Sequence, residues 1–212
     1  MKVLFVFIIR IIKKILFAFE KKTFELEIIK KIINSNDNIL DIGANKGQTV
    51  DKFLRFKKNL NFYIFEPHFK YYIFLKKKFK SLAKIKIYNF GVGNKEQNKN
   101  FYFTENKKHQ YAFSFNPAKY LNKRKKVKLV RLDDFFSANK RIQIIKIDVE
   151  GYEHDVLLGS KNILKKYKPY IFLEVTNVTI EKCYKLLKYY NYNICVYEYY
   201  IFKNSKYGWK KS

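Results

Sequence analysis

The feature that most constrains the fold is a regular alternation of short apolar segments with longer helical stretches. The apolar segments lie at 38–42, 61–66, 85–90, 143–148 and 169–175. Buried strands that alternate with helices pair mainly in parallel, because each helix carries the chain back along the sheet. After residue 175, TIEKCYKLLKYY predicts a helix and NICVYEYYIF predicts a closing strand. We therefore predict an α/β fold with a doubly wound, mainly parallel sheet.

The alternation is interrupted between the third and fourth apolar segments. NKNFYFTEN and KKVKLVRL predict extra strands or a hairpin-like excursion, with HQYAFSFNPAKY as a loop between them. In doubly wound sheets, ligands bind at the carboxyl ends of the strands. We expect the functional side chains at that edge, and acceptor specificity in the excursion and in the aromatic C-terminal tail.

The first residues form a lead before the domain, and we divide the chain into a lead at 1–35 and a domain at 36–212. On a helix, one sector of roughly 120° contains Lys2, Arg10, Lys13, Lys14, Glu20 and Lys21, which predicts an amphipathic helix with a mainly basic face. The apolar run at 3–9 is too short to span a bilayer. Two interpretations stay open: a helix in an anionic membrane interface, and a helix packed on the domain or on a second subunit.

The chain is strongly basic, with a formal net charge of +27. One interpretation is affinity for polyanions; the other is compositional bias toward Lys, Asn, Ile, Phe and Tyr, which AT-rich codons encode. Neither Cys183 nor Cys195 has a metal-like spacing, and three scattered histidines (His68, His109 and His154) complete no zinc signature. We predict a cytoplasmic protein, with peripheral contact at the inner face of the membrane through residues 1–22, and no metal site.

The stretch NILDIGANKGQ places a glycine turn directly after the first strand. Asp41 ends the strand, and Gly43 and Gly47 frame the turn. The spacing D-x-G-x-x-x-G lacks both the dinucleotide fingerprint and the lysine of a P-loop, which disfavours a pyrophosphate ligand. Glu66 ends the second strand, where a carboxylate can accept both hydroxyls of a ribose. A ribose without a phosphate fits S-adenosylmethionine; the alternative is that Glu66 only caps an exposed strand end.

The fourth strand continues into the segment IIKIDVEGYEHDVLLGS, with Asp148 and Glu150 at its carboxyl end. Five segments follow one another in order: DIGANKG, FEP, VRLDDF, KIDVEGYEHDVLLGS and PYIFLEV. In this order and at these distances they resemble the FkbM family of S-adenosylmethionine-dependent methyltransferases. The resemblance covers residues 36–176.

The resemblance implies the seven-stranded sheet of the Rossmann-like methyltransferase type and methyl transfer to a hydroxyl oxygen of a small molecule or sugar. It also implies a role for each matching position. Asp41, Gly43, Asn45 and Gly47 would line the methionine end of the cofactor, Glu66 the ribose, Gly91 and Val92 the adenine; Asp148 would lie near the sulfonium, and Glu150 and Glu174 would face the acceptor.

The catalytic roles of the carboxylates follow from the reaction. An alcohol has to lose its proton, and a carboxylate within hydrogen-bond reach can take it. Glu150 is the first candidate and Glu174 the second. Asp148 could instead bind the cofactor ammonium or, with its neighbours, a metal ion. Glu153 and Asp133 each have a structural alternative, as a first-turn acid and as the N-cap of the helix after VRL.

Two other functions compete with a glycan or glycolipid O-methyltransferase. The charge invites a nucleic-acid (RNA) methyltransferase. Against it, the turn after the fourth strand is Asp-Val-Glu-Gly, whereas enzymes that methylate adenine amino groups resemble one another in an Asp/Asn-Pro-Pro-aromatic turn. Both cysteines lie far from the active-site turns, which disfavours pyrimidine carbon methylation. The third possibility is a silent, membrane-associated binding module with the same fold.

Overall fold

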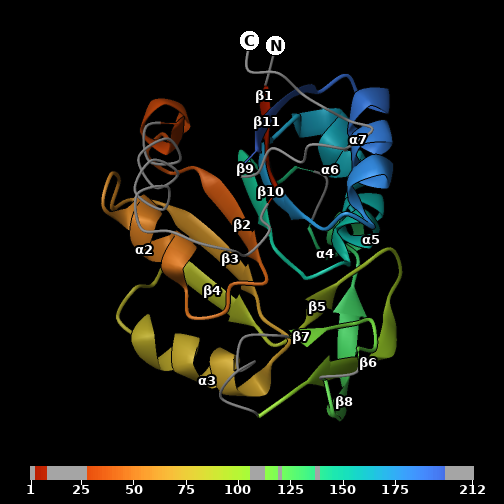
Figure 1. Ribbon diagram of the computed structural model, residues 1–212. Coiled ribbons are helices and arrows are strands. Elements are labelled where there is room, and N and C mark those ends of the chain that lie inside the picture. The colour runs from red at the N-terminus through yellow and green to blue at the C-terminus, as the bar shows by residue number, and fades with distance from the viewer. Residues whose placement is uncertain (1–2, 9–27, 106–112, 119–120, 137–138, 199–212) are drawn as a thin grey trace.

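The computed structural model describes residues 3–8, 28–105, 113–118, 121–136 and 139–198. Its main sheet has the strand order β11-β1-β10-β9-β2-β3-β4, and all neighbours are parallel (Figure 1). The strands are β1 (Val3–Ile8), β2 (Asn38–Ile42), β3 (Asn61–Phe65), β4 (Ile85–Tyr88), β9 (Ile144–Ile147), β10 (Tyr170–Val175) and β11 (Asn193–Glu198).

The five contiguous strands β10-β9-β2-β3-β4 are those predicted from the apolar segments, and they form the parallel core that positions the site. The prediction of an α/β fold with a parallel sheet is confirmed. The closing strand β11 was also predicted. The seventh strand, β1, was not predicted, because residues 3–8 were assigned to the amphipathic helix. That assignment is wrong for residues 3–8, since β1 pairs with β10 on one side and β11 on the other. Residues 9–27 of the predicted helix lie outside the described residues.

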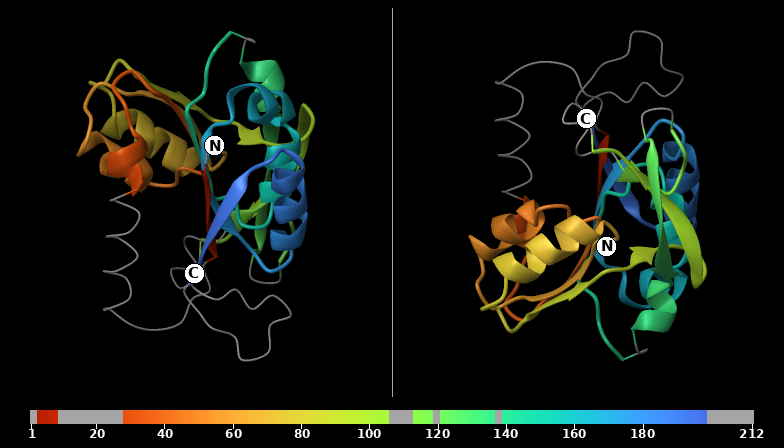
Figure 2. Two further views of the ribbon diagram at one scale, coloured as in Figure 1. Left: turned by 90° about the horizontal axis from the view of Figure 1, so that it is seen from above. Right: turned by 90° about the horizontal axis from the view of Figure 1, so that it is seen from below.

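Helices cover both faces of the sheet (Figure 2). On one face, Ile39, Phe62, Ile144 and Phe172 pack with residues of α2 (Gln48–Leu54) and α3 (Phe69–Lys78). On the other face, alternate residues of the same strands pack with α4 (Leu132–Phe135), α5 (Glu153–Leu158), α6 (Lys161–Tyr167) and α7 (Ile180–Tyr189). Both faces of the parallel sheet are therefore buried, as continuous apolar strands require.

The predicted excursion is a second sheet with the order β5-β8-β6-β7. Its strands are β5 (Gly91–Val92), β6 (Gln97–Phe103), β7 (Phe113–Ser114) and β8 (Lys123–Val130). β6 and β8 are antiparallel, which confirms the hairpin-like pairing. Phe101, Phe115, Leu129 and Tyr152 form its apolar cluster, so this sheet packs against the segment that follows β9. No helix in the described part of the chain is long and apolar enough to cross a membrane.

Candidate active site

The glycine turn after β2 contacts the turn after β9. Gly43 N–H donates to the Phe65 carbonyl at 2.9 Å, and its φ is +79°. A Cβ on Gly43 would lie 1.9 Å from the Asp148 carbonyl oxygen, a distance that no side chain tolerates. Only glycine meets both conditions, positive φ and close backbone approach. This contact brings the predicted cofactor turn against the predicted catalytic turn.

Four charged side chains gather at this edge of the sheet. Asp41, Lys146 and Glu174 share the strand face of Ile39, Ile144 and Phe172, because side chains alternate along each strand. Asp148 follows β9 in the same alternation. Lys146 Nζ lies 2.9 Å from Asp148 Oδ2 and 3.4 Å from the Gly43 carbonyl oxygen. One cation is therefore surrounded by three carboxylates.

The charges of this cluster are coupled. Burial disfavours the charged form of Lys146, but the carboxylates of Asp148 and Asp41 outweigh it and raise the pKa of Lys146. Burial also raises the pKa of Asp41 to about 6, against the attraction of Lys146. Both carboxylate oxygens of Asp41 are buried without a hydrogen-bond partner. Such oxygens are costly to leave unpaired, which indicates a ligand that donates to them.

Glu66 is fully buried at the end of β3, so the alternative of an exposed strand cap is excluded. Its Oε2 accepts from Asn45 N–H at 2.7 Å, and its Oε1 accepts from His68 N–H at 2.8 Å. Burial raises the pKa of Glu66 to about 8, although the two amide hydrogen bonds oppose the shift. When Glu66 is ionised, each carboxylate oxygen keeps a second lone pair for a ligand hydroxyl.

A small cavity lies between the two turns and the second sheet. Its lining is Gly43, Glu66, Pro67, Phe101, Phe113, Phe115, Asp148 and Val149. Three predicted cofactor residues, Gly43, Glu66 and Asp148, are thus brought together. The cavity holds about 20 Å³, far below the roughly 300–1,000 Å³ of ligand pockets, because phenylalanine rings fill it. We expect these rings to move when a ligand binds.

Three other predicted cofactor residues have close protein contacts. A Cβ on Gly47 would lie 2.7 Å from the Phe79 ring, so this glycine lets the start of α2 pack against the end of α3. A Cβ on Gly91 would lie 2.4 Å from the side chains of both Leu129 and Phe115. Val92 pairs with Val130 in the second sheet. Their contact with a cofactor stays a prediction.

Glu150 lies in the strained turn after β9, with φ of 49°. The second sheet holds this turn from one side, since Ser114 Oγ donates to the Glu150 carbonyl at 2.8 Å and Asn116 Nδ2 donates to the Gly151 carbonyl at 3.1 Å. The Glu150 side chain is at the solvent-exposed rim. Partial desolvation and the charges of Asp148 and Glu153 raise its pKa to about 7. A carboxylate with this pKa suits proton transfer near neutral pH.

Glu153 holds the same turn from the other side. It is buried, its Oε1 accepts from Gly151 N–H at 2.7 Å, and its Oε2 accepts from Thr179 Oγ at 2.6 Å. Glu153 is therefore a positioning residue. Asp133 is a cap, but for another helix than predicted: it accepts from the amides of Asn162 and Ile163 at the start of α6.

Comparison with known proteins identifies the fold that carries this site. Residues 41–194 match the model of the methyltransferase FkbM domain. The chain belongs to this family. A comparison with curated proteins finds no match. One similar solved structure is titled a precorrin-6y C5,15-methyltransferase from Geobacter metallireducens GS-15; it has 15% sequence identity and a TM-score of 0.47, and the match covers 81% of this chain and 71% of that chain. Another is titled a putative rRNA-methylase from Clostridium thermocellum; it has 12% sequence identity and a TM-score of 0.46, and the match covers 84% of this chain and 82% of that chain.

The residues of this FkbM domain suit the cofactor that a methyltransferase family implies, S-adenosylmethionine. The unpartnered Asp41 carboxylate suits an ammonium group, and Glu66 has lone pairs for ribose hydroxyls. In the described part of the chain, no group of three His, Cys, Asp or Glu side chains is arranged to hold a metal ion.

Sequence reasoning missed Lys146, the cation at the centre of the carboxylate cluster. Its signal was a single lysine inside the apolar run IIKID, where a charged side chain needs a partner. Ser114 and Thr179 were also missed, and they carried no comparable signal, because their contacts to the turn after β9 are long-range.

Proposed function

We propose that this FkbM domain transfers a methyl group from S-adenosylmethionine to a hydroxyl of a sugar in a surface glycan or glycolipid. The observation that carries the proposal is the position of Glu150. It lies at the rim of the turn that contacts the cofactor turn through Gly43, and its pKa is about 7. A hydroxyl acceptor needs such a base, whereas a thiol or amine acceptor depends on it less.

Four residues would hold the cofactor. Asp41 would accept from its ammonium group and Glu66 from its ribose hydroxyls, and Gly43 and Asp148 line the same cavity as Glu66. S-adenosylmethionine supplies an electrophilic methyl group when bound. The charge of Lys146 opposes the rise in the pKa of Asp41, which stays at about 6, so that Asp41 remains an acceptor at neutral pH.

Glu150 takes the proton of the acceptor hydroxyl, and Glu174 is the second candidate for this role. Lysines on the inner face of the second sheet favour an acidic sugar. Lys99 Nζ lies 4.6 Å from the centre of the Tyr152 ring, and Lys125 Nζ lies 4.9 Å from that of Phe69. Tyr152 itself follows the turn that carries Glu150, so Lys99 lies close to the rim.

Methyl transfer from radiolabelled S-adenosylmethionine to glycan, glycolipid and RNA fractions tests the proposal. We expect label in a glycan or glycolipid, and a loss of about 10²–10⁴-fold in Glu150→Gln with unchanged cofactor affinity. Glu96→Gln is the matched control, since Glu96 is an exposed carboxylate paired with Lys128. Label in RNA alone would favour the rival function. Cofactor binding without transfer to any fraction would favour a silent binding module.

A further inference from the structure

Helix α3 presents large apolar side chains to solvent. Phe69 is 52% exposed, Ile73 is 45% exposed and Phe74 is 44% exposed, and Leu82 just beyond the helix is 40% exposed. Most exposed apolar residues in a folded chain are scattered singly. Here three of them lie within two turns of one helix, which makes a contiguous patch.

Lysines share the outer face of α3 with these apolar residues. With about 100° per residue, Phe69, Ile73 and Phe74 fall in one half of the helix, and Tyr71, Leu75 and Phe79 occupy the other, buried half. The same outer half carries the exposed lysines Lys70, Lys76, Lys77 and Lys80, and Lys78, which is also exposed, lies at the border between the halves. We call this set, from Phe69 to Leu82, the α3 surface.

Acidic side chains do not neutralise the α3 surface. Helix α3 contains no Asp or Glu. The nearby Asp51 is paired with Lys78 at 2.5 Å, and the nearby Glu105 is paired with Lys123. Both carboxylates are thus occupied by lysines other than Lys70, Lys76, Lys77 and Lys80. The exposed lysines keep their full positive charge for an external partner.

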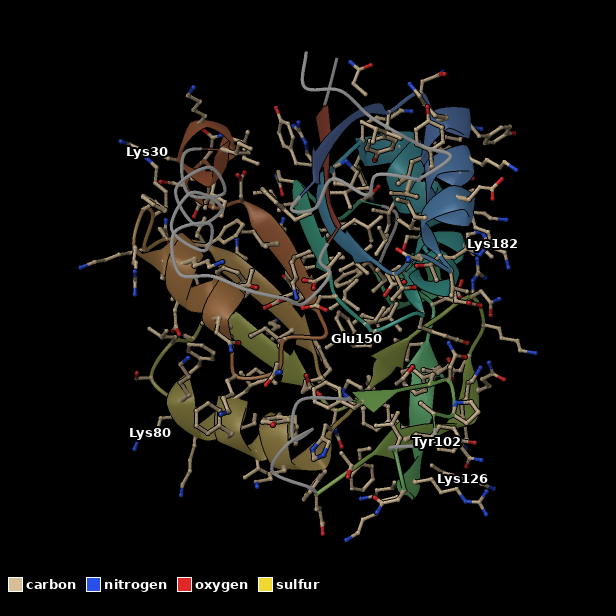
Figure 3. All side chains as sticks on the ribbon, in the orientation of Figure 1. Lys30, Lys80, Tyr102, Lys126, Glu150 and Lys182 are labelled. Atoms are coloured by element: carbon tan, nitrogen blue, oxygen red, sulfur yellow. The ribbon has the colours of Figure 1, made fainter. Side chains whose placement is uncertain are left out.

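The second sheet extends this charge. β8 begins with Lys123, which pairs with Glu105, and continues with the exposed cations Arg124, Lys125 and Lys126. Lys125 Nζ lies over the Phe69 ring. α3 and β8 lie at the same end of the molecule (Figures 1 and 2). Figure 3 shows Lys80 and Lys126 pointing outward on either side of this end. Lys125 therefore adds its charge directly beside an exposed ring of α3, and Lys126 adds charge to the same end of the molecule.

We propose that the α3 surface docks on an anionic lipid bilayer. Lysines beside exposed aromatic and aliphatic side chains are the composition of helices that lie in a membrane interface. Anionic headgroups attract the lysines, and Phe69, Ile73 and Phe74 enter the acyl boundary. RNA would use the same charges, but it gives no reason for exposed isoleucine and phenylalanine on a helix far from any base-stacking groove.

Docking on this surface has a consequence for the active site. Phe69 is three residues from Glu66, which lines the cavity, and β8 belongs to the sheet that holds the Glu150 turn. The membrane would then lie next to the rim of the site. An acceptor sugar carried on a lipid would reach the rim without leaving the bilayer. The docking itself does not depend on the chemistry proposed above.

Vesicle co-sedimentation of the full chain tests the proposal. We expect binding to phosphatidylcholine vesicles that contain phosphatidylglycerol and little binding to phosphatidylcholine alone. Lys76→Glu/Lys77→Glu should weaken binding by about thirtyfold or more, since each lysine at an anionic surface contributes about 1 kcal/mol. Ile73→Ser/Phe74→Ser should weaken it at least about tenfold, because it removes the inserted apolar area.

Two matched controls make the result specific to α3. Lys161→Glu/Lys165→Glu on α6 changes the net charge equally, and Tyr189→Ser removes an exposed ring on α7 that is 78% exposed. Both should bind vesicles as the parent does. Equal losses in the controls would overturn the proposal. So would unchanged binding of Ile73→Ser/Phe74→Ser, since charge without insertion points to a polyanion such as RNA. Calorimetry with S-adenosylmethionine on each variant separates lost docking from lost folding or lost cofactor binding.

Discussion

Lys146 Nζ and Asp148 Oδ2 lie 2.9 Å apart, and Asp41 is the register partner of Lys146 on the adjacent strand. The lysine is thus in direct contact with this carboxylate cluster. Without it, neighbouring negative charges would face one another at a partly buried sheet edge.

Lys146→Met should lower the free energy of unfolding by about 2–4 kcal/mol at pH 7, because it leaves buried carboxylates without a counter-charge. The loss should shrink as the pH falls through about 6, where Asp41 takes up a proton. Urea denaturation at several pH values measures this loss of unfolding free energy. Lys128→Met is the control: Lys128 pairs with Glu96 in solvent, and its loss should cost less than about 1 kcal/mol. Equal losses in the two variants would contradict a central role for Lys146.

Glu66 should make the protein less stable as the pH rises. Its pKa is raised from the usual 4.5 to about 8 in the folded state, so the folded chain keeps a proton that the unfolded chain releases. The stabilisation is complete below pH 4.5 and is lost as the pH rises through about 8, by at most about 1.4 kcal/mol per pH unit. Glu66→Gln should flatten this slope in urea titrations between pH 5 and 8. An unchanged slope would mean that Glu66 stays ionised.

The rate of methyl transfer should rise with pH through about 7 and then level off, because Glu150 accepts a proton only when ionised. Rate measurements at saturating cofactor and acceptor give this profile. In Glu150→Gln the remaining activity should lose the inflection. A profile that persists in Glu150→Gln but disappears in Glu174→Gln would transfer the role of base to Glu174.

Thr179→Val should destabilise the protein by about 1–3 kcal/mol, because the buried Glu153 carboxylate loses its 2.6 Å hydrogen bond. The turn that carries Glu150 depends on the same carboxylate through Gly151. We therefore expect a lower kcat with little change in cofactor affinity. Thr179→Ser keeps the hydroxyl and is the control. Thermal unfolding and calorimetry measure the two effects, and parent-like kcat in Thr179→Val would exclude a positioning role.

The position of the side chains at the strand ends could be predicted, because the topology of a parallel sheet places them at one edge. Once the apolar segments are assigned to a parallel sheet, Asp41, Glu66 and Asp148 must share its carboxyl edge, whatever the details of packing. The roles of the glycines were less predictable. Gly43 and Gly47 look alike in the sequence, yet their contacts differ. Gly43 packs against the Asp148 carbonyl, and Gly47 packs against the side chains of Leu75 and Phe79.

β1 could not be predicted from local pattern. A short apolar run fits a buried strand and a helix equally, and the charged residues after it favoured the helix. Only its pairing with β10 and β11, more than 160 residues along the chain, decides the question. The contacts of Ser114 with Glu150 have the same long-range character.

The place of β1 between β10 and β11 has a consequence for how the chain is completed. In the described sheet, β11 pairs with β1 and with no other strand. β1 must therefore wait until Asn193–Glu198 has been synthesised. Such a pairing is slow to form, because it closes a long loop of chain. An N-terminal deletion would remove the only neighbour of β11, so trimming the lead interferes with folding before it reveals anything about membranes.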